Sequence, residues 1–223
     1  AGVIIEPDAD LETAVTRCVT GGFGYAGQTC ISVQRIFVHQ SHYDQFLQSF
    51  VEKVQLLPTG DPALETTVVG PLINEQAAIR VETWIQEAVS QGATLHTGGN
   101  RQSSVMEPTV LKNVSSTMKV CCEEIFGPVV TISPYTTLQE ALDRMNDSPF
   151  GLQAGIFTQN IDAMYHTYAN LEVGAVLVNE IPTFRADHMP YGGVKQSGLG
   201  REGVRYAIQE LTEPKLLIVK SPT

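Results

Sequence analysis

Residues 128–145, PVVTISPYTTLQEALDRM, combine a predicted strand with the helix that follows it, and this pattern decides the fold. The apolar, β-branched run at 128–133 predicts the strand. Thr137 and Glu140 have the spacing of a capping box, which predicts a helix that continues to about Met145. Because strands and helices alternate in this way along the chain, we expect an α/β fold whose sheet is largely parallel and carries helices on both faces.

The same alternation extends on both sides of this stretch, and no linker divides the chain. Further strands are predicted at 31–38, 93–96, 109–114, 154–158, 174–179 and 215–220. Further helices are predicted at 9–18, after a capping box of Ser41 and Asp44, after Asn74, after Asn160 and at 202–210. A cluster of glycines beginning at Gly21 and Gly22 is expected to end the first helix.

The composition is that of a folded, acidic protein. Its 223 residues include 14 Lys and Arg against 24 Asp and Glu, a net charge of −10, and 43% are hydrophobic. That apolar content argues against disorder, and the acidic balance argues against nucleic acid or an anionic membrane as the main partner. No apolar run reaches the roughly 18 residues that a membrane-spanning helix needs. The N-terminal segment 1–10 is acidic and lacks the basic start of a signal peptide, so we expect a cytoplasmic protein.

One cysteine lies where a reactive group would be placed. The four cysteines, at 18, 30, 121 and 122, lack the spacing of a zinc site, so no metal is expected. Cys30 ends the glycine-rich segment 23–30, FGYAGQTC, between a predicted helix and a predicted strand. A loop on an α/β scaffold can expose such a thiol to a substrate, and backbone amides there could face a developing oxyanion. The residues alone leave a nucleophile and a packing cysteine as equal alternatives.

Three motifs in the same order and spacing make the chain similar to the aldehyde dehydrogenase superfamily. The segment 23–30, with Arg35 beyond it, resembles that family's F-x-x-x-G-Q-x-C sequence around the catalytic cysteine. Residues 123–128, EEIFGP, and 190–202, PYGGVKQSGLGRE, resemble two further family segments. The agreement covers nearly the whole chain.

The resemblance implies a mechanism and a cofactor. Cys30 matches the nucleophile, which would attack an aldehyde to give a thiohemiacetal, pass a hydride to NAD or NADP, and leave a thioester for hydrolysis. Glu124 would accept hydrogen bonds from the nicotinamide ribose, and Phe126 would pack beside the nicotinamide.

Two departures from the family pattern bear on the substrate. Tyr25 stands where the family often has Asn, and Tyr191 stands where it has Phe. Together with Arg185 in the loop 179–193, these residues predict a small polar aldehyde, either hydroxylated or with an anionic tail. Pairing of Arg185 with Asp187, which would only brace the loop, is an equal alternative.

The resemblance also implies that the chain corresponds to the second half of such an enzyme. We expect a catalytic domain at 1–211 and an oligomerisation strand at 212–223 that forms a homo-oligomer. The family's general base, its oxyanion asparagine and its nucleotide-binding domain would precede Ala1, so the isolated chain is expected to be inactive. The alternative is a non-catalytic assembly module built on the same fold.

Overall fold

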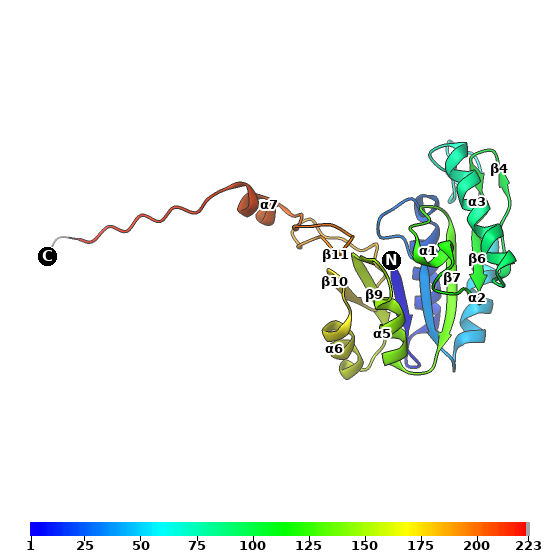
Figure 1. Cartoon of the computed structure of the whole chain (residues 1–223), viewed down its shortest axis with the longest axis horizontal. Coiled ribbons are helices and arrows are strands. Elements are labelled where there is room, and N and C mark those ends of the chain that lie inside the picture. Colours follow the sequence, from blue (N-terminus) through cyan, green and yellow to red (C-terminus); the bar gives the residue numbers. More distant parts are fainter. Residues whose placement is uncertain (222–223) are drawn as a thin grey trace.

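The computed structural model describes residues 1–221, which form an α/β fold around one seven-stranded sheet. Figure 1 shows this sheet with its covering helices. The strand order is β10-β9-β1-β2-β7-β6-β3, and all neighbours run parallel except β3, which is antiparallel to β6. The expected fold class is therefore confirmed. The strands of this sheet are β1 Gly2–Ile5, β2 Arg35–His39, β3 Thr94–Thr97, β6 Thr109–Lys112, β7 Val129–Tyr135, β9 Gln153–Phe157 and β10 Ala175–Val178.

Two short antiparallel pairs lie outside the main sheet, and helices connect most of its strands. The pairs are β4 Arg101–Gln102 with β5 Val105–Met106, and β8 Phe150–Gly151 with β11 Val194–Lys195. The helices are α1 Leu11–Phe23, α2 Tyr43–Gln55, α3 Glu75–Ser90, α4 Lys119–Cys122, α5 Leu138–Asn146, α6 Ile161–Asn170 and α7 Val204–Leu211, with a 3₁₀ turn, η1, at Gly24–Gly27.

The sheet separates two hydrophobic cores, because successive side chains of a strand point to opposite faces. In β1, Val3 and Ile5 belong to the larger core, which α1, α2 and α3 cover. Ile4 belongs to the smaller core, which includes Leu142 of α5 on the opposite face. All three β1 side chains are fully buried, as expected for a central strand of a covered parallel sheet.

Several predicted elements are wrong in detail. The pattern does not predict β1, although this strand lies in the interior of the sheet, between β9 and β2. The first helix does not end at Gly21 but continues to Phe23, because the glycines allow close packing: a Cβ at Gly21 would lie 2.7 Å from a methyl group of Val33. The strand expected at 31–38 is shorter and begins at Arg35, after a loop in which Val33 N donates to Gly21 O.

The predicted capping box of Ser41 and Asp44 is also wrong. The helix α2 begins at Tyr43 with His42 as its N-cap, and His42 makes no side-chain capping bond. The Ser41 hydroxyl instead lies 2.8 Å from Nδ1 of His39, so a local hydrogen bond outside the helix uses the group that the pattern assigned to the cap.

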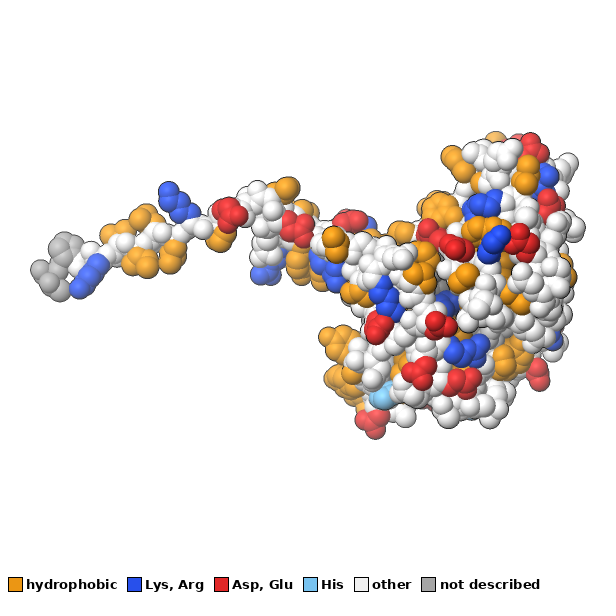
Figure 2. All heavy atoms as spheres, in the orientation of Figure 1, with side chains coloured by type: hydrophobic (Ala, Val, Ile, Leu, Met, Phe, Trp, Pro, Cys, Tyr) orange, Lys and Arg blue, Asp and Glu red, His pale blue; other side chains and the backbone are white. Residues whose placement is uncertain are grey.

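The C-terminal segment leaves the body of the molecule. From residue 212 to 221 the structure has no helix or strand, and the segment runs away from the sheet beyond α7 (Figure 1). Leu216, Leu217, Ile218 and Val219 are each at least 80% exposed, and apolar side chains follow this segment in Figure 2. The strand predicted at 215–220 is thus not formed within the described chain, since a strand needs a paired neighbour. Residues 222–223, the end of the predicted oligomerisation segment 212–223, lie outside the described residues.

Candidate active site

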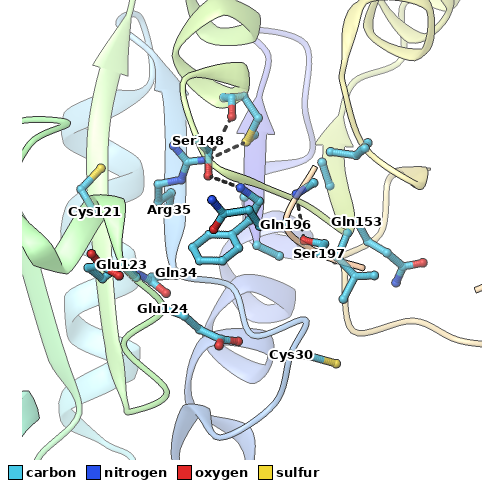
Figure 3. A pocket seen from close by; sticks show the side chains of 18 residues that line it. Cys30, Gln34, Arg35, Cys121, Glu123, Glu124, Ser148, Gln153, Gln196 and Ser197 are labelled. Carbon is cyan, nitrogen blue, oxygen red and sulfur yellow. Dashed lines mark hydrogen bonds between the residues drawn. The ribbon is translucent and has the colours of Figure 1, made fainter. Parts of the chain in front are cut away.

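A cavity of about 240 Å³ opens where the parallel strands begin (Figure 3). Its walls come from the loops that enter β1, β2, β7 and β9, and from the loop after β11. Because the strands are parallel, these loops meet at one edge of the sheet although they are far apart in the sequence. Cys30 and Glu124, from two different motifs, both line this cavity.

A tight left-handed turn precedes the nucleophile candidate. Tyr25 and Ala26 have positive φ angles of 52° and 54°, and Gly27 follows with a φ of 70°. Non-glycine residues rarely adopt this conformation, so the turn is a strained feature of the loop. Beyond it, Cys30 is an exposed free cysteine, whereas Cys18 in α1 is fully buried. Burial raises the pKa of the Cys18 thiol, which marks Cys18 as a packing residue.

Among the residues that the structure describes, Cys30 has one side-chain hydrogen-bond partner, Tyr191. The Cys30 sulfur and the Tyr191 hydroxyl lie 3.0 Å apart, although the two residues are 161 positions apart in the sequence. Tyr191 is only 6% exposed, and burial, followed by the contact with Cys30, raises the pKa of its phenol. The Arg185 guanidinium lies over the Tyr191 ring, 4.3 Å from its centroid, and donates to Glu202 at 2.9 Å. The fold therefore brings together the predicted residues Cys30, Arg185 and Tyr191.

Hydrogen bonds from Gln34 and Arg80 hold the loop that carries Glu124 and Phe126. Gln34 donates to the carbonyl of Glu123 at 2.9 Å, and its side-chain oxygen accepts from Ile125 N. From α3, Arg80 donates to the Ile125 carbonyl at 2.6 Å. Phe126 has a positive φ of 51° and is 41% exposed, so its ring extends from the loop toward solvent.

The Glu124 side chain lies where it could contact a dinucleotide. Within residues 1–221 its carboxylate has no ion-pair or hydrogen-bond partner of its own, and it points into the cavity shared with Cys30 (Figure 3). An unpaired carboxylate at such a place suits a ribose diol, and an exposed aromatic ring two residues later suits a flat heterocycle. Glu124 and Phe126 therefore fit the part of the cofactor that the sequence assigned to them.

Tyr25 lies apart from the other predicted substrate residues. It is 84% exposed and lines a different hollow, which Phe126 and Pro71 also line. The structure thus groups Tyr25 with the loop of Phe126 rather than with the Cys30–Tyr191 pair. Positive φ at Tyr25 explains the difference, because the left-handed turn directs this side chain outward.

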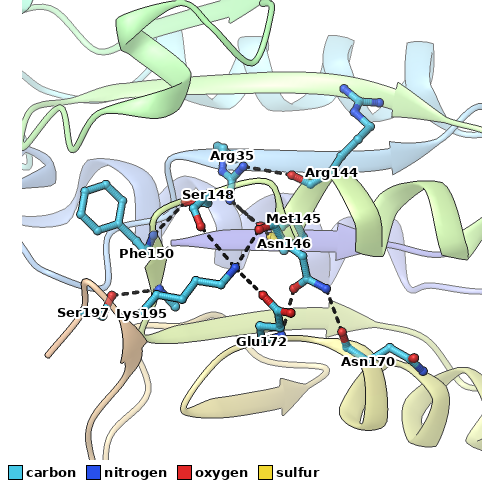
Figure 4. A network of polar contacts seen from close by, with 11 residues as sticks. Arg35, Arg144, Met145, Asn146, Ser148, Phe150, Asn170, Glu172, Lys195 and Ser197 are labelled. Carbon is cyan, nitrogen blue, oxygen red and sulfur yellow. Dashed lines mark hydrogen bonds and ion pairs between the residues drawn. The ribbon is translucent and has the colours of Figure 1, made fainter. Parts of the chain in front are cut away.

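Sequence reasoning gave no role to several residues that shape the cavity. Lys195 of β11 donates to the carbonyl of Asn146 at 2.7 Å and pairs with Glu172 at 2.6 Å (Figure 4). The Ser197 hydroxyl accepts from Gly151 N at 2.9 Å. Lys195 and Ser197 fall in the motif at 190–202, which was the one available signal, but no local pattern predicts their partners.

Arg35 is the other such residue. It is half-buried at the start of β2, and its guanidinium donates to the carbonyls of Arg144 and Met145 at 3.2 and 3.0 Å (Figure 4). Burial, above all other causes, lowers the pKa of Arg35. These bonds tie the end of α5 to the nucleophile loop, which gives the arginine of the first motif a structural role.

Within residues 1–221, no three His, Cys, Asp or Glu side chains gather as they would around a metal ion. Across the same part of the chain, no helix combines the length and the apolar character required to cross a membrane.

Comparison with known proteins identifies the family. A model described as "Aldehyde dehydrogenase family" matches residues 1–217. The chain is 45% identical over 219 residues to a 3-sulfolactaldehyde dehydrogenase from Priestia aryabhattai. This match covers 98% of the present chain and 46% of that protein. It therefore spans about half the length of the curated relatives it matches.

Solved structures agree with this result. Aldehyde dehydrogenase 21 from Physcomitrella patens, in complex with the reaction product succinate, is 42% identical with a TM-score of 0.95, and the match covers 99% of this chain and 46% of that one. A glyceraldehyde-3-phosphate dehydrogenase from Methanocaldococcus jannaschii, complexed with NADP, is 42% identical with a TM-score of 0.91 over 94% and 45% of the two chains. The motifs, the fold and these matches lead to one conclusion: the chain belongs to the aldehyde dehydrogenase family.

Proposed function

We propose that residues 1–211 are the catalytic half of an NAD(P)-dependent dehydrogenase that oxidises a small polar aldehyde to a carboxylate, with Cys30 as nucleophile. The observation that carries this proposal is the cavity in which the exposed Cys30 thiol and the Glu124 carboxylate occur together. A thiol on a loop can supply the nucleophile for covalent aldehyde oxidation, and a carboxylate in the same cavity can accept hydrogen bonds from the hydroxyls of a cofactor.

The chemistry at Cys30 follows from thiolate reactivity. Its sulfur would bond to the aldehyde carbon and give a tetrahedral thiohemiacetal, and the backbone amides of the loop could stabilise the oxyanion. Bound NAD(P) would supply the acceptor for the hydride of the former aldehyde C–H. Water would then cleave the remaining thioester between carbon and sulfur, which releases the carboxylate and returns the thiol.

Glu124 and Phe126 are the residues of this chain that we assign to the cofactor. Glu124 would accept hydrogen bonds from the ribose hydroxyls, and Phe126 would limit the positions open to the nicotinamide. The NADP complex of the Methanocaldococcus jannaschii relative supports the cofactor class. The remaining contacts would come from a nucleotide-binding domain that precedes residue 1.

For the substrate we favour an aldehyde with an anionic tail. One relative is named for 3-sulfolactaldehyde, and one solved structure holds succinate; both molecules are small and anionic. In this chain Arg185 lies over the ring of Tyr191, whose hydroxyl contacts Cys30, so one residue separates its positive charge from the nucleophile candidate. The ion-pair partner of Arg185 is Glu202, whereas the bracing alternative assigned Asp187, and an anionic tail would have to share the guanidinium with the Glu202 carboxylate.

Selective alkylation tests the role of Cys30. In the full-length enzyme, iodoacetamide should modify Cys30 much faster than the buried Cys18, and the aldehyde substrate should protect it. Cys30→Ser should lower NAD(P)H production by about a thousandfold or more, with Cys18→Ser as the matched control. Equal slow labelling of both cysteines, or full activity in Cys30→Ser, would contradict the proposal.

We further propose that the exposed segment 212–221 joins copies of the chain into a homo-oligomer in the cytoplasm. Apolar side chains at 216–219 would be covered if this segment added a strand to the sheet edge of another copy. Deletion of 212–223 should lower the molar mass measured by sedimentation equilibrium. If the chain were only an assembly module, the deletion would abolish the oligomer and Cys30 would show no preference in alkylation. An unchanged molar mass after the deletion would exclude the proposed contact between copies.

A further inference from the structure

We propose that the hydroxyl of Tyr191 is the hydrogen-bond donor that positions the Cys30 thiolate, and that the Arg185–Glu202 pair holds the ring of this tyrosine in place. The inference deepens the proposed function, since it rests on Cys30 as the nucleophile. It assigns to Tyr191 a role that a phenylalanine at the same position could not have, because a phenyl ring has no donor.

The geometry of Tyr191 does not depend on the hydroxyl. Its backbone forms a two-way bridge with Glu202, in which Tyr191 N donates to Glu202 O at 3.1 Å and Glu202 N donates to Tyr191 O at 2.6 Å. The Arg185 guanidinium covers the ring face at 4.3 Å and is fixed by its bond to the Glu202 carboxylate at 2.9 Å. The bridge and the stacking hold the ring, so the hydroxyl is left to face the Cys30 sulfur at 3.0 Å.

The phenol is the donor when the sulfur is ionised, because a thiolate can only accept. Burial raises the pKa of Tyr191 well above its usual value, the contact with Cys30 acts in the same direction, and the Arg185 charge opposes both. Tyr191 therefore keeps its proton at pH values at which an ordinary tyrosine, with a pKa of about 10, begins to ionise.

Other charged groups face Cys30, and they also influence how its alkylation rate depends on pH. Glu123, Glu124 and Arg35 line the same cavity as Cys30. None of these groups changes when only the Tyr191 hydroxyl is removed. A comparison between Tyr191 and Phe at this position therefore isolates the O–H···S contact.

This contact would have two opposite effects on thiol reactivity. A hydrogen bond to the thiolate increases its population at a given pH, while it reduces the nucleophilicity of each ion. A charge-assisted bond of ordinary strength is equivalent to about one pH unit in the ionisation midpoint. With the usual dependence of thiolate nucleophilicity on basicity, the rate per ion changes by about threefold in the opposite direction.

The test is the rate of iodoacetamide alkylation of Cys30 between pH 6 and 11 in the full-length protein, read by mass spectrometry of the Cys30 peptide. In Tyr191→Phe we expect the midpoint about one pH unit higher, a rate about threefold lower below the midpoint, and a plateau about threefold higher. Ultraviolet absorbance of the thiolate should give the same midpoint. Tyr168→Phe, which removes a 73% exposed phenol in α6, is the matched control and should not change the profile.

The outcomes separate this inference from the proposed function. If the pH profiles of wild type and Tyr191→Phe coincide, or differ by one constant factor at every pH, the inference is wrong. A ring that only restricts access to Cys30 would change the alkylation rate by the same factor at every pH. Wild-type activity in Cys30→Ser would instead overturn the nucleophile assignment, whatever the profile of Tyr191→Phe. Crossed profiles together with an inactive Cys30→Ser enzyme support both.

Discussion

The backbone of Gly27 lies directly against the carbonyl of Gly127, so the nucleophile loop and the Glu124 loop touch without intervening side chains. A Cβ at Gly27 would be only 2.1 Å from the Gly127 oxygen. Gly27 also has a φ of 70°, which side chains rarely tolerate. This contact joins the first and second motifs, and it sets how closely Cys30 and Glu124 approach each other.

Gly27→Ala should therefore destabilise the protein. Strain at positive φ and the clash with Gly127 together should lower the free energy of unfolding by about 2 kcal/mol or more, as measured by urea denaturation. Gly24→Ala is the matched control, because Gly24 lies in the same loop with a φ of −55° and open space around its Cβ position. Equal losses in the two variants would show that the contact with Gly127 is unimportant.

Glu124→Gln in the full-length enzyme should slow hydride transfer more than it weakens aldehyde binding. The amide keeps the shape of the side chain but loses the charge that strengthens hydrogen bonds from the ribose, so we expect a decrease of about tenfold or more in the single-turnover hydride rate. Glu123→Gln is the control, since the carboxylate of Glu123 lies next to Glu124 in the sequence but has no assigned cofactor role. A hydride rate that stays at the wild-type value would remove Glu124 from the site.

Arg185→Ala should discriminate between substrates. If the guanidinium binds an anionic tail, kcat/KM for 3-sulfolactaldehyde should fall about tenfold or more relative to that for propanal. Glu202→Gln should act in the opposite direction, because it releases the guanidinium from its carboxylate partner. Equal decreases for both aldehydes in Arg185→Ala would mean that Arg185 only supports Tyr191.

Tyr135 should make stability fall in alkali. Its buried hydroxyl donates to the Ile5 carbonyl at 2.9 Å and to Glu6, and burial followed by the Glu6 contact raises the pKa of Tyr135 far above its unfolded value of about 10. A raised folded-state pKa stabilises the protein fully below about pH 10, and this contribution is lost as the pH rises further, by at most about 1.4 kcal/mol per pH unit.

The measurement is urea denaturation of the wild type and of Tyr135→Phe at pH 8, 10 and 11. The variant should be less stable at pH 8, because it loses the hydrogen bond to Ile5, but its stability should fall less steeply above pH 10. Tyr168→Phe should retain the wild-type slope, since that phenol is exposed. Identical slopes in wild type and Tyr135→Phe would assign the alkaline loss to other groups.

Local sequence signals determined the elements that depend on neighbouring residues. Asn74 caps α3 by accepting from Ala77 N at 2.8 Å, and Thr137 caps α5 by accepting from Glu140 N at 3.3 Å, as their spacing predicts. The motifs identified the family and placed Cys30 on a loop between a helix and a strand. These features were accessible because capping and periodicity involve residues only a few positions apart.

The arrangement of the site was decided by tertiary structure. The sequence pattern did not predict β1, which pairs with β2 on one side and with β9 on the other. The position of β1 brings the nucleophile loop, which enters β2, and the loop that enters β9 to the two sides of one strand. The contacts of Cys30 with Tyr191 and of Gln34 with the Glu123 loop join residues 161 and 89 positions apart. Strand order in a parallel sheet determines which loops share an edge, and no local pattern encodes that order, because each pairing is fixed by burial against distant strands and helices.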